Sequence, residues 1–293
     1  MILMPNYSLS VSQEQLSALL NEYKTYEKEN SNQYILFQAS KEGVLIQGYK
    51  SGKVVLQGDY QNELEYIKSV LGLESYQAVG SDEVGTGDLF GPIVVCSCFT
   101  SLDDIKYLES LGVRDSKNMT DNQIIKLGPI LAKKLIHSIL ILTPEKYNEM
   151  IRKGFNMNKI KAYLHNQSIL KTVEKLEGDV PVIVDQFCDP SVYFNYLKGE
   201  KSIFKKIEFY TKAESVHISV AAASIIARYA FLAKMQQYSK FIGVKLLKGA
   251  GAEVDRQLIE IYRSRGYKSL RPITKLNFKN LTKNNVLPPS RLS

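Results

Sequence analysis

Residues 81–92 read Ser-Asp-Glu-Val-Gly-Thr-Gly-Asp-Leu-Phe-Gly-Pro, and this stretch decides the fold. An apolar run, residues 76–80, leads to Asp82 and Glu83, and a second run, residues 92–99, leads away from the glycines. Two apolar runs joined by a short glycine-rich segment are typical of a strand, a tight turn and a returning strand. The sequence therefore predicts a hairpin whose first strand ends in two adjacent acids.

The two adjacent acids indicate a cation site. Neighbouring carboxylates repel each other, and hard oxygen ligands beside a loop with free backbone amides suit Mg²⁺ and a phosphate group. The same dipeptide is also common at the solvated corner of a hairpin. The pattern by itself leaves both interpretations open.

The composition is that of a globular protein in a reducing compartment. The chain has 293 residues, 44% hydrophobic and 23% charged, which suits one large or two ordinary domains. Nothing resembles a membrane span or a signal peptide, so we expect a cytoplasmic protein. Of the 3 cysteines, Cys96 and Cys98 share one face of a predicted strand, where we expect them to pack as small apolar residues, and Cys188 stands alone.

The charge is unevenly distributed along the chain. The formal net charge is +8, yet residues 1–75 hold 6 lysines and no arginine against 9 acids, a net of −3, so residues 76–293 carry +11. A basic main body predicts a polyanionic partner, most simply nucleic acid. A well-solvated basic surface would show the same charge.

The chain divides into two predicted domains. Residues 1–75 are expected to form a small α+β domain, in which three short strands form a meander between two helices. The expected elements are a helix over 12–29, strands over 34–39, 44–48 and 53–57, a helix over 63–71 and a linker over 72–77.

Residues 76–293 alternate strands and helices, which predicts an α/β domain. Because the first two strands form a hairpin and the later ones follow helices, the sheet is expected to be mixed. The expected strands cover 76–82, 91–100, 137–142, 181–185 and 206–210. The expected helices cover 102–111, 121–135, 144–153, 158–177, 191–197, 215–238 and 253–265.

Two further acids stand at the ends of predicted core elements. Asp185 ends the buried strand pattern of residues 182–184, and ligands of α/β sheets gather beyond the carboxyl ends of strands. Glu214 precedes a long helix, whose dipole keeps a carboxylate ionised. Asp185 could equally cap a helix, and Glu214 could serve helix electrostatics alone. With Asp82 and Glu83, these acids could hold two divalent ions for phosphodiester hydrolysis.

At this point the residues resemble a known family, the type 2 ribonucleases H, and ribonuclease HIII in particular. The resemblance spans residues 76–293 in order. Gly85-Thr86-Gly87 stands where ribonuclease HII typically has Gly-Arg-Gly, and Glu214 stands where it typically has Asp. The matching motifs are Asp-Glu-Val-Gly-Thr-Gly-Asp from 82, Phe-Gly-Pro from 90, Asp-Ser-Lys from 115, Val-Asp from 184, Lys-Ala-Glu-Ser from 212 and Val-Ala-Ala-Ala-Ser-Ile-Ile-Ala-Arg from 220.

The resemblance implies the fold and the reaction. We expect an RNase H-like catalytic domain, residues 76–293, with C-terminal helices, and an N-terminal substrate-binding domain, residues 1–75, that resembles the TATA-box-binding protein fold. The expected activity is endonucleolytic cleavage of the RNA strand of RNA/DNA hybrids with Mg²⁺ or Mn²⁺, leaving 5′-phosphate and 3′-hydroxyl ends.

The resemblance also implies roles for individual residues. The catalytic and metal-binding residues would be Asp82, Glu83, Asp185 and Glu214. The backbone of Gly85, Thr86 and Gly87 would enter the minor groove and read ribose 2′-hydroxyls. Ser116 and Lys117 would contact backbone phosphate, although a surface lysine is usually only solvated.

Two other functions stay open at this level. A ribonuclease HII-type enzyme would incise at single ribonucleotides in duplex DNA, and the missing loop arginine argues against it. An inert nucleic-acid-binding protein could share the fold, and the presence of all four acids argues against that. We expect a monomer.

Overall fold

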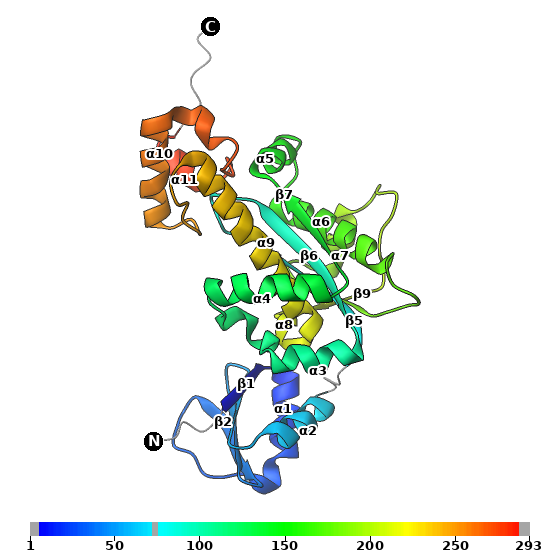
Figure 1. The fold of residues 1–293 in the computed structure, drawn as a ribbon. Coiled ribbons are helices and arrows are strands. Elements are labelled where there is room, and N and C mark those ends of the chain that lie inside the picture. The colour runs from blue at the N-terminus through cyan, green and yellow to red at the C-terminus, as the bar shows by residue number, and fades with distance from the viewer. Residues whose placement is uncertain (1–5, 72–75, 287–293) are drawn as a thin grey trace. The chain divides into compact units, whose positions relative to one another are not determined.

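The computed structural model describes residues 6–71 and 76–286. The chain divides into two compact units, Met1–Tyr76 and Gln77–Ser293 (Figure 1). The predicted linker, residues 72–77, lies mostly outside the described residues, and so does the side chain of Asp115.

The N-terminal unit is an antiparallel sheet of the order β1-β4-β3-β2. The sheet residues alternate between buried and accessible along β3, because successive side chains of a strand point to opposite faces. The helices contribute Leu16, Leu19 and Ile67 to the core that covers the buried face. The elements are β1 (Asn6–Ser10), α1 (Gln13–Glu22), the 3₁₀ helix η1 (Lys24–Tyr26), β2 (Ile35–Lys41), β3 (Val44–Tyr49), β4 (Lys53–Gln57) and α2 (Gln61–Val70).

This unit differs from the prediction at both ends of its first helix. A strand that we did not predict, β1, precedes the helix and pairs with β4. The helix begins at a capping box formed by Ser12 and Gln15 and ends at Glu22, well before the expected residue 29. The meander of β2, β3 and β4 and the closing helix lie where they were expected.

The second unit is built on a five-stranded mixed sheet of the order β7-β6-β5-β8-β9. The strands are β5 (Ala78–Val84), β6 (Ile93–Thr100), β7 (His137–Leu142), β8 (Val182–Asp185) and β9 (Ile207–Tyr210). The hairpin of β5 and β6 is antiparallel, whereas β8 runs parallel to β5 and β9 runs parallel to β8. The predicted α/β fold with a mixed sheet is therefore confirmed.

Helices cover both faces of this sheet (Figure 1). Helix α6 packs on one face, where Ser97 hydrogen bonds with Ser168 and Thr172, and α9 packs on the other. The helical elements are α3 (Leu102–Ser110), η2 (Val113–Asn118), α4 (Asp121–Lys134), α5 (Pro144–Arg152), α6 (Met157–Val173), α7 (Pro190–Tyr196), α8 (Ala213–Val216), α9 (Ile218–Ile242), α10 (Ala252–Leu270) and α11 (Lys279–Lys283).

Helix α9 is the central helix of the unit. A Cβ added at Gly80 of β5 would lie 2.2 Å from the backbone nitrogen of Val220, so only glycine lets the helix approach the sheet this closely. By length and a mean hydropathy of 1.4 the helix could cross a membrane, which the sequence-based expectation overlooked. Since 61% of that window is buried inside the protein, its apolar character serves the core.

One predicted helix, residues 215–238, is two helices. His217 is extended, with φ −136° and ψ 136°, and its Nδ1 accepts a hydrogen bond from the backbone N–H of Ser219 at 3.1 Å. The break lets α8 end and α9 begin with its own cap. Cys96 and Cys98 are fully buried in the core beside α9, as expected.

Candidate active site

Asp82 and Glu83 occupy the end of β5 and point to opposite faces of the sheet, as neighbours on a strand must. Asp82 lies on the same face as Gly80, toward α9, where the Ser224 hydroxyl hydrogen bonds to it. It also accepts a hydrogen bond from the backbone N–H of Glu83 at 2.7 Å. Glu83 lies on the face covered by α6. The two adjacent carboxylates are thus held by different helices.

Asp185 ends β8, the parallel neighbour of β5. Ser81 is in register with Val184, so Asp82 and Asp185, the next residue on each strand, lie side by side on one face. The Asp185 carboxylate accepts a hydrogen bond from the backbone N–H of Ala213, at the start of α8, at 2.8 Å. That contact ties the end of β8 to the helix that carries the next acid.

Glu214 lies in the first turn of α8 and is buried. The preceding residue but one, Lys212, adopts a left-handed conformation with φ 58°, which is uncommon for a side-chain-bearing residue. Glu214 forms an ion pair with Lys117 of η2, whose own side chain is 62% exposed. Strand β8, helix α8 and η2 therefore meet at the acids.

The motif Ser116-Lys117 is held from behind by α9. The guanidinium of Arg228 donates to the backbone carbonyl oxygens of Ser116 and Met119 at 2.8 and 3.0 Å. Ser116 itself is only 1% exposed. In this conformation Lys117 is accessible to a ligand and the Ser116 hydroxyl is not.

Like charges dominate the space between the strands. Burial, with the charges of Glu83 and Asp185, raises the pKa of Asp82 to about 8. Burial and the charges of Glu214 and Glu83 raise the pKa of Asp185 as well. A cation placed there would relieve both effects, and carboxylate oxygens are the ligands that Mg²⁺ and Mn²⁺ prefer.

The described residues do not yet form a chelating cluster. Among them, no group of three Asp, Glu, His or Cys side chains lies close enough together to hold a metal ion. The reason is local, because Glu83 is turned toward α6 and Glu214 is paired with Lys117. The chemistry of the donors fits a hard cation, whereas two of the four acids are neutralised by lysines here.

Two residues of α6 belong to the site and were not predicted. Lys161 forms an ion pair with Glu83, and His165 Nε2 lies 2.8 Å from the other oxygen of that carboxylate. His165 Nδ1 lies 2.8 Å from the hydroxyl of Ser81. Burial alone would raise the pKa of Glu83, but His165 and Lys161 hold it below its ordinary value. Glu83 is thus kept ionised and fixed in direction.

A sequence signal for this pair does exist. Lys161 and His165 are four residues apart, so they share one face of a helix. Both also contact the ring of Phe187: the Lys161 Nζ lies 4.0 Å from its centroid, and the imidazole stacks on it at 5.3 Å. The sequence spacing could show that Lys161 and His165 share one helix face. It could not show that this face packs over the end of β5.

The loop between β5 and β6, residues 85–92 (the glycine loop), is closely packed at Gly85 and open at Gly87. Gly85 has φ 91°, and a Cβ there would lie 2.2 Å from the carbonyl oxygen of Pro92. A Cβ at the exposed Gly87 would meet nothing within 4 Å. The accessible side of the loop is therefore the side of Thr86 and Gly87.

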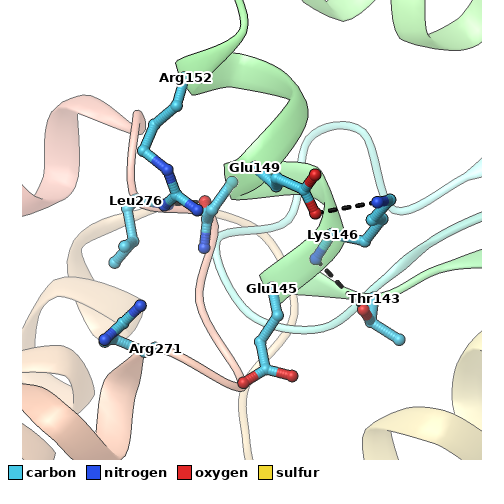
Figure 2. A pocket seen from close by; sticks show the side chains of 8 residues that line it. Thr143, Glu145, Lys146, Glu149, Arg152, Arg271 and Leu276 are labelled. Atoms are coloured by element: carbon cyan, nitrogen blue, oxygen red, sulfur yellow. Dashed lines mark hydrogen bonds and ion pairs between the residues drawn. The ribbon is translucent and has the colours of Figure 1, made fainter.

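A pocket of about 380 Å³ lies elsewhere, between α5 and the segment that follows α10. Figure 2 shows Arg152 and Arg271 on its two walls and Leu276 beside α5. None of the predicted site residues lines it. The chemistry indicated by the acids is therefore not located at this pocket.

The chain is similar to known proteins over nearly its whole length. A family model described as Ribonuclease HII matches residues 79–281, and a model described as Domain of unknown function (DUF3378) matches residues 6–64. A protein named Ribonuclease HIII from Phytoplasma mali is 49% identical over 96% of this chain and 98% of its own. Another of that name from Bacillus pumilus is 40% identical over the same shares.

A solved structure is also similar over nearly the whole chain. The crystal structure of Bst-RNase HIII in complex with Mn²⁺ superposes with a TM-score of 0.72 at 37% identity, covering 96% of this chain and 98% of that one. The similarity therefore includes both units and is not limited to the segment that carries the acids.

Proposed function

Because the chain belongs to the ribonuclease HII family, we propose that its acids form the active site of an endoribonuclease that cleaves the RNA strand of RNA/DNA hybrids. Within the family it is similar to proteins named ribonuclease HIII. The observation that carries the proposal is the side-by-side placement of Asp82 and Asp185 at the ends of two parallel strands. The products would be 5′-phosphate and 3′-hydroxyl ends.

The four acids are the proposed ligands of Mg²⁺ or Mn²⁺. Asp82 and Asp185 share one face and repel each other, and a cation would hold them together. Glu83 and Glu214 would complete the set once Lys161 and His165 release Glu83 and Lys117 releases Glu214. Bound cations would supply the activated water and the charge that stabilises the departing oxygen. The protein's part is to bring the carboxylates together, and the bound cation would hold Asp82 and Asp185 ionised.

The glycine loop is the proposed reader of the RNA strand. The 2′-hydroxyl separates RNA from DNA, and backbone groups of Gly85, Thr86 and Gly87 can reach it because no Cβ keeps Gly87 away from the sugar. Lys117, once released, would contact a backbone phosphate. A phosphate contact by Ser116 would require its buried hydroxyl to become accessible.

The N-terminal unit is proposed to bind the duplex with the open face of its sheet. The unit is acidic overall, but the side chains on this face include no acid among the described residues. Gln38 and Gln47 hydrogen bond to each other at 2.8 Å on this face, and the Tyr49 hydroxyl reaches Gln47. The face therefore offers hydrogen-bonding groups without repelling phosphate. Likeness to the TATA-box-binding protein fold stays a prediction, as do a monomer and a cytoplasmic location.

One assay tests the function against its nearest rival. We would offer the enzyme two labelled duplexes with Mg²⁺ or Mn²⁺: an all-RNA strand on DNA, and a DNA duplex with one ribonucleotide. We expect cutting of the hybrid and little cutting of the single ribonucleotide, because the loop lacks the arginine typical of ribonuclease HII. Equal rates on both would indicate ribonuclease HII-type specificity. Binding without cutting of either would support an inert binding protein.

A further inference from the structure

A fully buried lysine braces the glycine loop from behind. Lys275 lies between α10 and α11, and its Nζ donates hydrogen bonds to the carbonyl oxygens of Asp88 and Gly91, at 2.7 Å each. The Asp88 carboxylate instead accepts from the backbone N–H of Gly249 at 2.5 Å. Among the residues that the structure describes, Lys275 forms no ion pair. Burial lowers its pKa to about 7.

Burying a lysine side chain in the core is energetically unfavourable. Removing an ammonium from water without a carboxylate partner is strongly unfavourable, and an apolar side chain of the same volume would avoid that penalty. An apolar side chain would also leave two buried carbonyl oxygens without donors. The Lys275 ammonium donates to both carbonyl oxygens. This indicates that a lysine is present here because of its hydrogen bonds to the loop.

The backbone around Lys275 pairs with the same loop. Its N–H donates to the carbonyl oxygen of Leu89 at 3.0 Å, and the N–H of Gly91 donates to Ile273 at 2.8 Å. Phe90 and Thr274 form an antiparallel bridge between these bonds. The C-terminal segment therefore pairs with the loop through one antiparallel bridge, and the Lys275 side chain adds two hydrogen bonds to the same loop.

Helix α5 anchors this segment from the far side. Asn148 donates to the carbonyl oxygen of Thr274 at 2.9 Å and accepts from the backbone N–H of Leu276 at 2.8 Å. Leu276 is seen next to α5 in Figure 2. Asn148 therefore bonds to the residues on both sides of Lys275 and fixes this segment to helix α5. The position of Lys275 is set by α5 as well as by the loop.

We propose that Lys275 is a positioning residue that sets the conformation of the glycine loop and, through it, the recognition of the RNA strand. The inference rests on the proposed function, in which Gly85 to Gly87 read the ribose. The lysine holds the half of the loop from Asp88 to Gly91 and leaves the side of Gly87 free for a ligand. It touches no reacting group, so its effect is on substrate recognition.

The test is the full-length Lys275→Met enzyme, which keeps the volume and loses the donors. We expect KM for a labelled RNA/DNA hybrid to rise about tenfold with kcat changed less than about twofold, because recognition is lost and the acids are not. Affinity for Mn²⁺, measured by calorimetry without substrate, should be unchanged. Should Lys275→Met fold poorly, Asn148→Ala loosens the same brace from outside, and KM should rise about threefold.

The matched control is Thr172→Val. Thr172 is also fully buried, and its hydroxyl lies 3.2 and 3.1 Å from the backbone carbonyl oxygens of Ser97 and Ser168, on the sheet face that α6 covers. We expect it to lower the melting temperature and leave KM unchanged. If Lys275→Met and Thr172→Val raise KM in proportion to lost stability, or Lys275→Met leaves KM unaltered, the positioning role is wrong. If the wild-type enzyme cuts no hybrid, the proposed function has failed instead.

Discussion

The acid cluster and the glycine loop are neighbours in the chain but are stabilised in opposite ways. At the acids, like charges are buried together, and the pKa of Asp82 rises to about 8 as a result. At the loop, buried carbonyl oxygens of Asp88 and Gly91 each receive a donor from Lys275. Under the proposed function the two regions have different tasks: the loop would be organised before the substrate binds, whereas the acids would remain unfavourable until a cation joined them.

The largest effect should come from removing one acid. Asp185→Asn takes away a charge that a cation would need, while keeping the hydrogen bond to Ala213 available. Loss of several kcal/mol of charge stabilisation corresponds to a fall in cleavage rate of about a thousandfold or more. Single-turnover cleavage of a labelled hybrid measures it, and binding of the uncut hybrid should survive.

The control for this loss is Asp179→Asn. Asp179 precedes the same strand, is highly exposed and forms an ion pair with Lys206. The same chemical change there should leave the rate within about twofold, because exposed ion pairs contribute little. If Asp185→Asn also keeps a rate within tenfold of wild type, the acids are not the reacting centre.

The loop should respond to a methyl group by losing stability. Gly85→Ala forces a side chain onto a residue with φ 91° and brings its Cβ within 2.2 Å of the Pro92 carbonyl oxygen. Backbone cannot give way there, so we expect about 2 kcal/mol or more of lost unfolding free energy. Denaturant unfolding measures it. An unchanged midpoint would mean that the loop is not rigid.

Gly87→Ala sharpens the comparison within the loop itself. Nothing lies within 4 Å of the added Cβ, so stability should change by less than about 0.5 kcal/mol. The methyl group would nevertheless stand between the backbone and the ribose, and we expect KM for the hybrid to rise about tenfold. Normal KM with normal stability would place the ribose contact elsewhere.

At the acids, in contrast to the loop, we expect a substitution, Asp82→Asn, to increase the unfolding free energy. Between an ordinary carboxyl pKa near 4 and a folded value of about 8, the metal-free folded protein keeps on Asp82 a proton that the unfolded chain has released. Stability therefore falls as pH rises through this window, by up to about 1.4 kcal/mol per unit, and the loss is complete above it. Asp82→Asn removes this penalty.

We expect metal-free Asp82→Asn to be more stable than wild type at pH 8, by at least about 2 kcal/mol. The difference should shrink toward pH 5, where Asp82 is protonated in the folded protein. Melting curves of both proteins in chelator at the two pH values measure it. A wild-type protein that is the more stable of the two at pH 8 would show that Asp82 is not strained by its neighbours.

The sequence predicts the core strands well, and helix ends and contacts between distant elements poorly. Asp82, Glu83 and Asp185 could be placed because apolar strand patterns lead directly to them. The break at His217 could not, because helical spacing continues through it and only its cap to Ser219 reveals the new start. Strand β1 is short and precedes a strong helix signal, so nothing local marked it.

Two lysines and a histidine at the site also could not be predicted, because their partners are distant in the sequence. Lys161 and His165 contact Glu83 across about eighty residues of chain, and Lys275 contacts Gly91 across 184. Such residues have ordinary surroundings in the sequence, and only the packing of α6 and the C-terminal segment gives them a role. The opposite directions of Asp82 and Glu83 follow from strand geometry alone and could have been predicted.

The most direct test of the account is the melting temperature of wild type and Asp82→Asn at pH 8, each with and without Mn²⁺. If the buried acids await a cation, Mn²⁺ at about a hundred times its dissociation constant stabilises wild type by about 3 kcal/mol, or at least 5 °C. We expect less than half that shift for Asp82→Asn, and a full shift for Asp179→Asn. Equal shifts in all three proteins would contradict a cation site at the ends of β5 and β8.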